Sequence, residues 1–256
     1  MDTIQIAIKE KLATITLNRG RANSINLEMI AELNLAIKNL GADASVDGLI
    51  ITGKEGFFSA GIDLIEAYNY NEIQGRELWT EFLTLQANLV AFPKPFVAAI
   101  GGHSPAGGCV MALCTDYRVM ASGKFIIGLN EIPVGIIVPE VIFNLYAFWI
   151  GHRKAYQYLL EGKLLTVDEA LANCLVDEVC EPAELLAVAE NKVRLYMKQN
   201  AVTWSQSKQN MRAKLMEQFN ADLSASLDTM LKQWWAPETR KGLQLMIENL
   251  KSASNK

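Results

Sequence analysis

Glu131 is a carboxylate in a stretch of sequence that is otherwise mostly apolar. It lies in Gly128–Ile136, within a run that extends from Phe125 to Val138. Removal from water raises the pKa of a carboxyl group and makes it a better proton acceptor at neutral pH. The setting would suit a general base, although the spacing alone favours a surface glutamate in a turn before Pro133.

Two segments rich in small residues have the composition of an oxyanion site. They are Phe58–Leu64 (FSAGIDL) and Pro105–Cys109 (PAGGC), each placed between a predicted strand and a predicted helix. The first N–H groups of a helix have no intrahelical acceptor, and two converging N–H groups can hold the oxygen of a polarised carbonyl. Either loop alone would more often be a tight structural turn, but two of them in one chain indicate oxyanion chemistry.

Several other chemistries are excluded by the residues present. Neither GxxxxGK[ST] nor GxGxxG occurs, which argues against a nucleotide hydrolase or a Rossmann dehydrogenase. The only histidines are His103 and His152, and the four cysteines lack a CxxC pair, so we expect no metal site and no histidine-dependent hydrolase. The cysteines are expected to be free buried thiols. The carboxylates of Asp116, Glu140 and Asp177 are expected to cap helices or face solvent.

Hydrophobic patterning predicts the elements that position these loops. Residues 4–8 and 12–17 predict a hairpin, and apolar residues at helical spacing predict a helix from Asn26 to Gly41. Apolar runs at 48–52 and 96–100 predict buried strands. Further strands are expected at 117–120 and 125–127. The recurrence of strand, glycine loop and helix indicates stacked right-handed crossovers in an α/β fold, with loops gathered at one site.

From Gly151 onward the pattern is mostly helical, up to Leu250, with a frayed polar tail at 251–256. We divide the chain into a core at residues 1–199 and a helical region at 200–256. The helical region carries Trp204, Trp234 and Trp235, large apolar groups that a surface helix hides poorly. They are expected to be buried either between subunits or against the core of the same chain.

The composition is that of a folded globular protein and does not favour binding to polyanions. Of 256 residues, 50% are hydrophobic and 20% are charged, which is sufficient for a real core. The net charge of −4 and the absence of a basic cluster argue against binding to nucleic acid or to an anionic membrane. The N-terminus lacks a basic segment followed by an apolar run, and no stretch reaches 18 apolar residues, so we expect a cytoplasmic protein.

Six short motifs in a fixed order make the chain resemble the crotonase, or enoyl-CoA hydratase/isomerase, superfamily. The motifs are Leu17–Arg19 with Ala22–Ser24, Phe58–Leu64, Pro93–Pro95, Pro105–Cys109, Asp116–Arg118 and Ile150–Ala155. The resemblance implies a spiral of repeated ββα units with a helical C-terminal trimerisation region. It also implies a homotrimer or a hexamer built of two trimers, and an acyl-CoA thioester ligand whose CoA is part of the substrate, with no separate cofactor.

The resemblance also implies roles for individual residues. The N–H groups of Ile62 and Gly107 would form the oxyanion hole for the thioester carbonyl, and Glu131 would be the base. The substrate-binding positions that it implies are Ala22, Ala60, Gly61, Asp63, Leu64 and Gly108, with CoA lying along the backbone of this set.

The type of reaction depends on the number of catalytic carboxylates. Hydratases of this superfamily have one glutamate directly after the Gly-Gly-Cys motif and a second about twenty residues later; this chain has Val110 and Glu131. A single base suits proton transfer between C2 and C4 better than addition of water. The pattern therefore resembles the mitochondrial-type Δ3,Δ2-enoyl-CoA isomerases. The alternatives are another CoA-thioester activity such as hydration, and a non-catalytic acyl-CoA-binding relative; the acyl chain length stays open.

Overall fold

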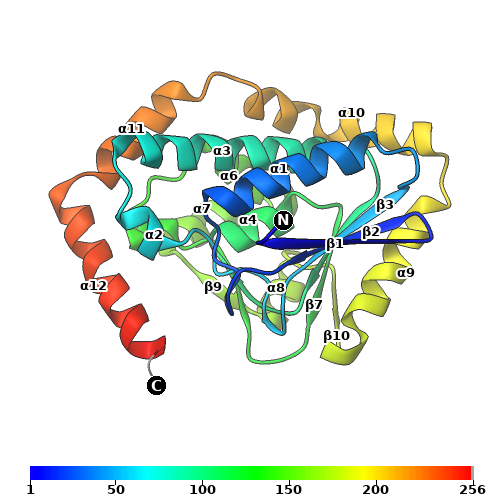
Figure 1. The fold of residues 1–256 in the computed structure, drawn as a ribbon, viewed down its shortest axis with the longest axis horizontal. Coiled ribbons are helices and arrows are strands. Elements are labelled where there is room, and N and C mark those ends of the chain that lie inside the picture. Colours follow the sequence, from blue (N-terminus) through cyan, green and yellow to red (C-terminus); the bar gives the residue numbers. More distant parts are fainter. Residues whose placement is uncertain (255–256) are drawn as a thin grey trace.

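The computed structural model describes residues 1–254 as two β-sheets surrounded by helices (Figure 1). The first sheet has the order β1 (Ile4–Lys9), β2 (Leu12–Leu17), β3 (Gly48–Thr52), β5 (Phe96–Ile100), β7 (Tyr117–Ala121) and β10 (Glu178–Cys180). The second has the order β4 (Gly56–Phe57), β6 (Gly102–Pro105), β8 (Ile126–Gly128) and β9 (Leu164–Thr166). The β1–β2 hairpin is antiparallel as predicted, and the first sheet is parallel from β2 onward.

The chain winds as a spiral in which each turn contributes one strand to each sheet and then a helix. One turn is β3, β4 and the helices α2 (Leu64–Tyr68) and α3 (Glu72–Ala91). The next is β5, β6 and α4 (Gly107–Leu113), and the third is β7, β8, α5 (Glu131–Val134) and α6 (Glu140–Ile150). This is the repeated ββα architecture that the resemblance implies.

The apolar strands face two helical layers. In β5, Phe96, Ala98 and Ile100 pack in the main core, whereas Val97 and Ala99 pack with α9 (Leu185–Met197) on the opposite face of the sheet. Because both faces are covered, this strand is apolar throughout instead of alternating. In the main core, α1 (Leu27–Ala42) packs against α3, and its N-cap is the predicted Asn26, whose side chain accepts from the Met29 N–H.

The remaining helices follow the third turn of the spiral. They are α7 (His152–Glu161), α8 (Val167–Ala172), a short 3-10 helix (Pro182–Glu184), α10 (Ala201–Phe219), α11 (Ser224–Trp234) and α12 (Pro237–Ser254). The last helix extends beyond the expected end at Leu250; of the expected frayed tail, residues 255–256 lie outside the described part of the chain. No helix in residues 1–254 is long and apolar enough to cross a membrane.

The C-terminal helices share the main core with the spiral. Leu215, Leu227 and Leu243 are buried in the same hydrophobic cluster as the first sheet. Trp234 is 2% exposed and packs edge-on against Trp79, with ring centroids 5.8 Å apart. Trp234 was expected to be buried either between subunits or against the core of its own chain. The structure shows burial against the core of its own chain. The boundary predicted at residues 199–200 falls between α9 and α10 and stays a prediction.

Two expectations about carboxylates are wrong. Asp116 accepts hydrogen bonds from Phe96 N (2.9 Å) and Lys208 Nζ (2.8 Å), and its second oxygen pairs with Arg212 at 3.0 Å. Asp177 pairs with the fully buried Arg118. Both expectations failed because the basic partners are distant in sequence or buried by other elements. The cysteine expectation is half right: Cys109 and Cys114 are buried, Cys180 is partly exposed and Cys174 is exposed, and all four are free.

Candidate active site

Glu131 is the first residue of α5, the helix that follows β8 in the third turn of the spiral. The residue as a whole is partly exposed, but its Oε2 atom is buried and has no hydrogen-bond partner in the described part of the chain. Burial raises the pKa of Glu131 from its ordinary value of 4.5 to about 7, against a smaller lowering by a backbone hydrogen bond. The carboxyl group can therefore both accept and release a proton near neutrality.

The first glycine loop is fastened to the segment before α1. Ala60 N–H donates to Ala22 O at 2.9 Å, and Ile25 N–H donates to Gly61 O at 2.8 Å. Asp63 N–H donates to Ile25 O, also at 2.8 Å. These bonds flank Ile62 on both sides and hold its backbone in place without using its own N–H group.

The second glycine loop places Gly107 at the start of α4. Ala106 precedes it with φ 49° and ψ −125°, a conformation that L-residues rarely adopt. Ala106 N–H donates to Gly128 O at 2.8 Å, so the loop is tied to the end of β8, three residues before Glu131.

The two loops touch each other at their glycines. A Cβ atom on Gly61 would lie 3.0 Å from Gly107 N, and one on Gly107 would lie 3.3 Å from Gly61 Cα. Among the described residues, no acceptor receives a hydrogen bond from the N–H group of Ile62 or of Gly107. The two loops thus hold two free donors, the kind of group from which an oxyanion hole is built.

The residues predicted to bind CoA fall into two groups. Ala22, Ala60, Asp63 and Leu64 are partly exposed and lie along the fastened first loop. Gly61 and Gly108 are buried instead, and a Cβ atom on Gly108 would lie 2.3 Å from Ser59 O, so this second glycine allows the two loops to touch.

Charged side chains brace the first loop from outside. Arg19 pairs with Asp63 and Glu66, each at 2.7 Å, and Asp63 also caps α2 by accepting from the N–H groups of Ile65 and Glu66. The Asp63 side chain is thus engaged within the protein, which leaves the backbone as the surface for a ligand at this position.

Two more positions bear on the chemistry. Val110 is 2% exposed and packs in the apolar core, so α4 supplies no second carboxylate. Glu140 is the first residue of α6 and is exposed, as expected for a glutamate at a helix start. Among the described residues, no cluster of three or more His, Cys, Asp or Glu side chains is arranged to hold a metal ion.

Sequence reasoning missed two residues around this site. Asn23 has φ 48°, and its buried side chain accepts from Arg19 N–H and donates to Phe58 O; its place in the Ala-Asn-Ser motif was the available signal, since asparagine tolerates this conformation. Tyr146 is buried on α6 and its hydroxyl has no hydrogen-bond partner in the described part of the chain, and an aromatic residue in an apolar helix gives no such signal.

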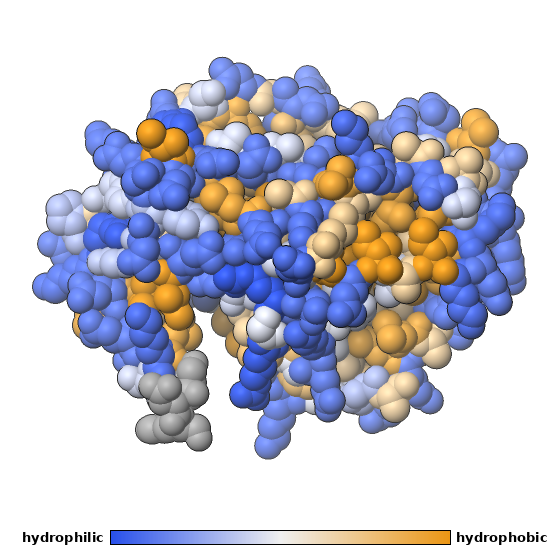
Figure 2. Space-filling model, in the orientation of Figure 1, coloured by the Kyte–Doolittle hydropathy of each residue, from blue (hydrophilic) through white to orange (hydrophobic). Residues whose placement is uncertain are grey.

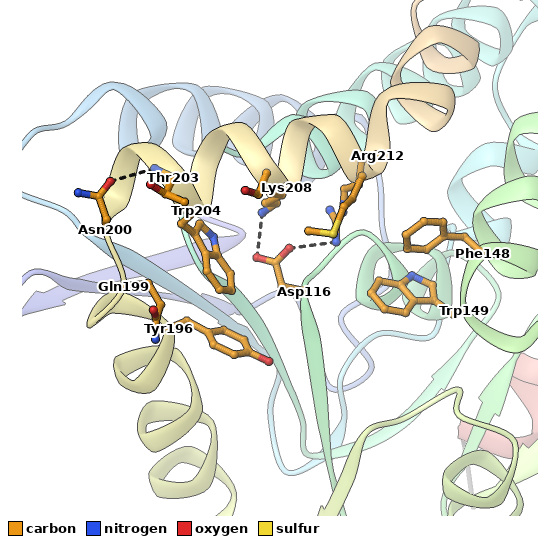
Figure 3. Close-up of a pocket in the computed structure, with 12 residues that line it drawn as sticks. Asp116, Phe148, Trp149, Tyr196, Gln199, Asn200, Thr203, Trp204, Lys208 and Arg212 are labelled. Atoms are coloured by element: carbon orange, nitrogen blue, oxygen red, sulfur yellow. Dashed lines mark hydrogen bonds and ion pairs between the residues drawn. The ribbon is translucent and has the colours of Figure 1, made fainter.

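A cavity of about 580 Å³ lies elsewhere, between α6, the end of α9 and α10 (Figure 3). It is lined by four aromatic side chains, Phe148, Trp149, Tyr196 and Trp204, and by Asp116 with its two basic partners. None of the predicted site residues lines it.

The sequence of the chain matches known proteins over most of its length. The sequence model described as enoyl-CoA hydratase/isomerase matches residues 7–255. The mouse protein "Enoyl-CoA delta isomerase 1, mitochondrial" is 35% identical over 246 residues, which cover 94% of this chain and 84% of the mouse protein. The "Crotonyl-CoA hydratase" of Syntrophomonas wolfei is 32% identical over 188 residues, 72% of each chain.

The fold comparison points the same way. The crystal structure of the human mitochondrial delta3-delta2-enoyl-CoA isomerase superposes with a TM-score of 0.95 at 29% identity, covering 98% of this chain and 99% of the human one. Such agreement over the whole chain includes the C-terminal helices as well as the spiral.

Proposed function

Because the chain belongs to the enoyl-CoA hydratase/isomerase family, we propose that it shifts the double bond of a 3-enoyl-CoA to the 2-position with Glu131 as its single base. The observation that carries this proposal is the presence of one carboxylate with a buried, unpartnered oxygen and of two free N–H groups in adjoining loops. The absence of a carboxylate at Val110 favours isomerisation over hydration.

The proposed reaction balances without any other reactant. Glu131 takes a proton from C2, and the electron pair moves into the thioester as an enolate conjugated with the double bond. The N–H groups of Ile62 and Gly107 hold the enolate oxygen. Glu131 then returns the proton at C4, which leaves a conjugated 2-enoyl thioester and a regenerated base. No separate cofactor is proposed, since CoA arrives as part of the substrate.

CoA is proposed to lie along the first loop. Ala22, Ala60, Gly61, Asp63 and Leu64 would present backbone to the nucleotide and pantetheine, and Gly108 would support them by letting the second loop approach. The partial exposure of four of these residues supports this placement.

The test supplies 3-enoyl-CoA and 2-enoyl-CoA in parallel and follows absorbance of the conjugated thioester. Isomerisation makes the absorbance appear from the first substrate. Faster disappearance of the second substrate would favour hydration, the second candidate, which the Syntrophomonas relative supports. Binding of both without turnover would identify a non-catalytic relative.

We propose in addition that the chain forms a homotrimer or a pair of trimers. Ile6 and Ile8 on β1 are 37% and 50% exposed, and Figure 2 shows apolar surface gathered over the β1–β2 hairpin. The cavity between α6 and α10 adds exposed aromatic surface. Contiguous apolar patches of this kind commonly mark protein interfaces. A stable monomer in light scattering at micromolar concentration would refute an oligomer.

The cytoplasm stays our proposed location, although the mouse and human relatives are named mitochondrial. Fractionation of cells that express the full chain would test it.

A further inference from the structure

The turn between α7 and β9 touches the segment that carries Glu131 on both sides of this residue. A Cβ atom on Gly162 would lie 2.2 Å from Cγ of Pro133, two residues after Glu131. A Cβ atom on Gly128, three residues before Glu131, would lie 2.7 Å from Lys163 O. Two neighbouring residues of one turn therefore lie against both ends of the stretch that carries the carboxylate.

The helix that begins with Glu131 has no buried face of its own. α5 is four residues long, the structure describes all four, and none of them is buried. Its main helical neighbours are α7 and α12. On the side of α12, a Cβ atom on Gly135 would lie 3.1 Å from Thr239 Cγ2. Since a single helical turn is not stable by itself, contacts with its neighbours set the position of Glu131.

The α7 side of the contact is the more rigid one. α7 buries Ala155 and Leu159 in the main core, and Gly162 N–H closes its end by donating to Leu159 O at 3.1 Å. Strand β9, which follows the turn, pairs antiparallel with β8. The ring of Pro133 cannot rotate out of the way, because it is closed onto the backbone. Added volume at position 162 is therefore relieved by movement of α5.

The same turn also links Glu131 to the second glycine loop. Gly128 lies against Lys163, and its carbonyl oxygen accepts from Ala106 N–H at 2.8 Å. Ala106 directly precedes the proposed donor Gly107. One turn thus supports both the base and the loop of the N–H donor, and proton transfer at a bound thioester depends on their relative placement.

We propose that Gly162 is a positioning residue: because it has no side chain, Pro133 packs against the end of α7, and this contact holds Glu131 at the place from which it takes the substrate proton. This inference rests on the proposed role of Glu131 as the base.

The test places an alanine at position 162. Carbon atoms in contact lie about 3.5–4.0 Å apart, so relief of the 2.2 Å contact requires a movement of about 1 Å. A misplacement of about 1 Å costs on the order of 10²-fold in rate, so kcat of Gly162→Ala for 3-enoyl-CoA should fall by about that factor. KM should change little, because the proposed CoA surface lies on the first glycine loop.

Gly151→Ala is the matched control, at the other end of α7. Gly151 also has a positive φ, 81°, but among the described residues no atom lies within 4 Å of a Cβ atom placed there. This variant has the strained backbone without the contact to α5, so its kcat should stay near that of the wild type.

A second substitution separates the contact from backbone strain. Gly162 has φ 58°, where alanine is strained whatever surrounds it. Pro133→Ala removes the ring atoms that would meet the new Cβ atom. The double variant Gly162→Ala with Pro133→Ala should therefore fold and have the kcat of Pro133→Ala alone, even where Gly162→Ala does not fold. A double variant that is slower than Pro133→Ala, or that does not fold, overturns the proposal.

A further readout does not depend on turnover. Burial raises the pKa of Glu131 to about 7, so a shift of α5 that exposes the carboxyl group should move its midpoint toward 4.5. Infrared titration of the protonated carboxyl band, assigned by its loss in Glu131→Gln, measures this midpoint without substrate.

The two readouts separate failure of the contact from failure of the proposed function. If the wild type proves not to isomerise 3-enoyl-CoA but the midpoint falls in Gly162→Ala and recovers in the double variant, the contact positions Glu131 and the proposed function fails. An unchanged midpoint in Gly162→Ala overturns the proposal, as does an unchanged kcat in an active enzyme or an equal loss in Gly151→Ala.

Discussion

Two buried carboxylates, Asp116 and Glu131, lie in opposite electrostatic surroundings. Asp116 accepts from a backbone N–H and from Lys208, and also pairs with Arg212, so its negative charge is fully matched. Burial lowers the pKa of Lys208 to about 8, against the opposing effect of Asp116. Among the described residues, Glu131 has neither a basic partner nor a hydrogen bond at Oε2. The ion pairs of Asp116 link α10 to the first sheet. The carboxylate of Glu131 has no such partner and can still accept a proton.

The difference extends to the backbone around each carboxylate. Near Asp116, the side chain of Arg212 donates to the carbonyl groups of Val90, Cys114 and Thr115. Near Glu131, the N–H groups of Ile62 and Gly107 are left without acceptors among the described residues. Unsatisfied polar groups are costly inside a protein, so their concentration in one place indicates a site completed by a ligand. The following variants test this division.

The largest expected effect is on catalysis at the unmatched carboxylate. Glu131→Gln keeps the shape of the side chain and removes its basicity, so turnover of 3-enoyl-CoA should fall by about 10²–10⁴-fold. Affinity for a CoA thioester, measured by calorimetry, should change little. Glu140→Gln serves as the control, because this glutamate is exposed at a helix start. Near-normal turnover in Glu131→Gln would contradict the single-base mechanism.

At the matched carboxylate we expect loss of stability instead. Asp116→Asn leaves Lys208 and Arg212 buried without their counter-charge, and breaking such a pair costs about 3–5 kcal/mol of unfolding free energy. Urea unfolding measures the loss. The folded fraction should retain wild-type KM. A variant of wild-type stability that has lost turnover would reverse the roles assigned to the two carboxylates.

Removal of one donor of the oxyanion hole should have a somewhat smaller effect. Gly107→Pro removes the N–H group, for an expected loss of about 2.7–4 kcal/mol of transition-state stabilisation, or 10²–10³-fold in kcat. Gly107→Ala is the matched control, because it adds a Cβ atom at the same place, 3.1 Å from Phe82 Cζ, and keeps the N–H group. Equal turnover in the folded proline and alanine variants would show that Gly107 is not a donor.

The comparison also shows what the sequence can and cannot predict. Glu131 and the two glycine loops could be proposed as a site from the sequence because each is a local pattern next to a strong hydrophobic signal. Strand β4 has only two residues and no apolar run, so no hydrophobic periodicity predicts it. Its position depends on its pairing with β6. The partners of Asp116 lie more than ninety residues later in the chain, which local patterns do not register.

The smallest expected effect is the pH dependence of stability that Glu131 imposes. Burial raises its pKa in the folded state from 4.5 to about 7, so the folded protein binds this proton more tightly than the unfolded chain does. The resulting stabilisation is fully present below pH 4.5 and is lost as the pH rises through about 7. Between pH 5 and pH 8, the unfolding free energy of the wild type should therefore fall by about 2–3 kcal/mol more than that of Glu131→Gln in urea titrations. Glu140→Gln should retain the wild-type difference, because its side chain is exposed. Equal pH dependence in wild type and Glu131→Gln would mean that Glu131 is as well solvated or as well paired as Asp116 is, and the contrast between the two carboxylates would be lost.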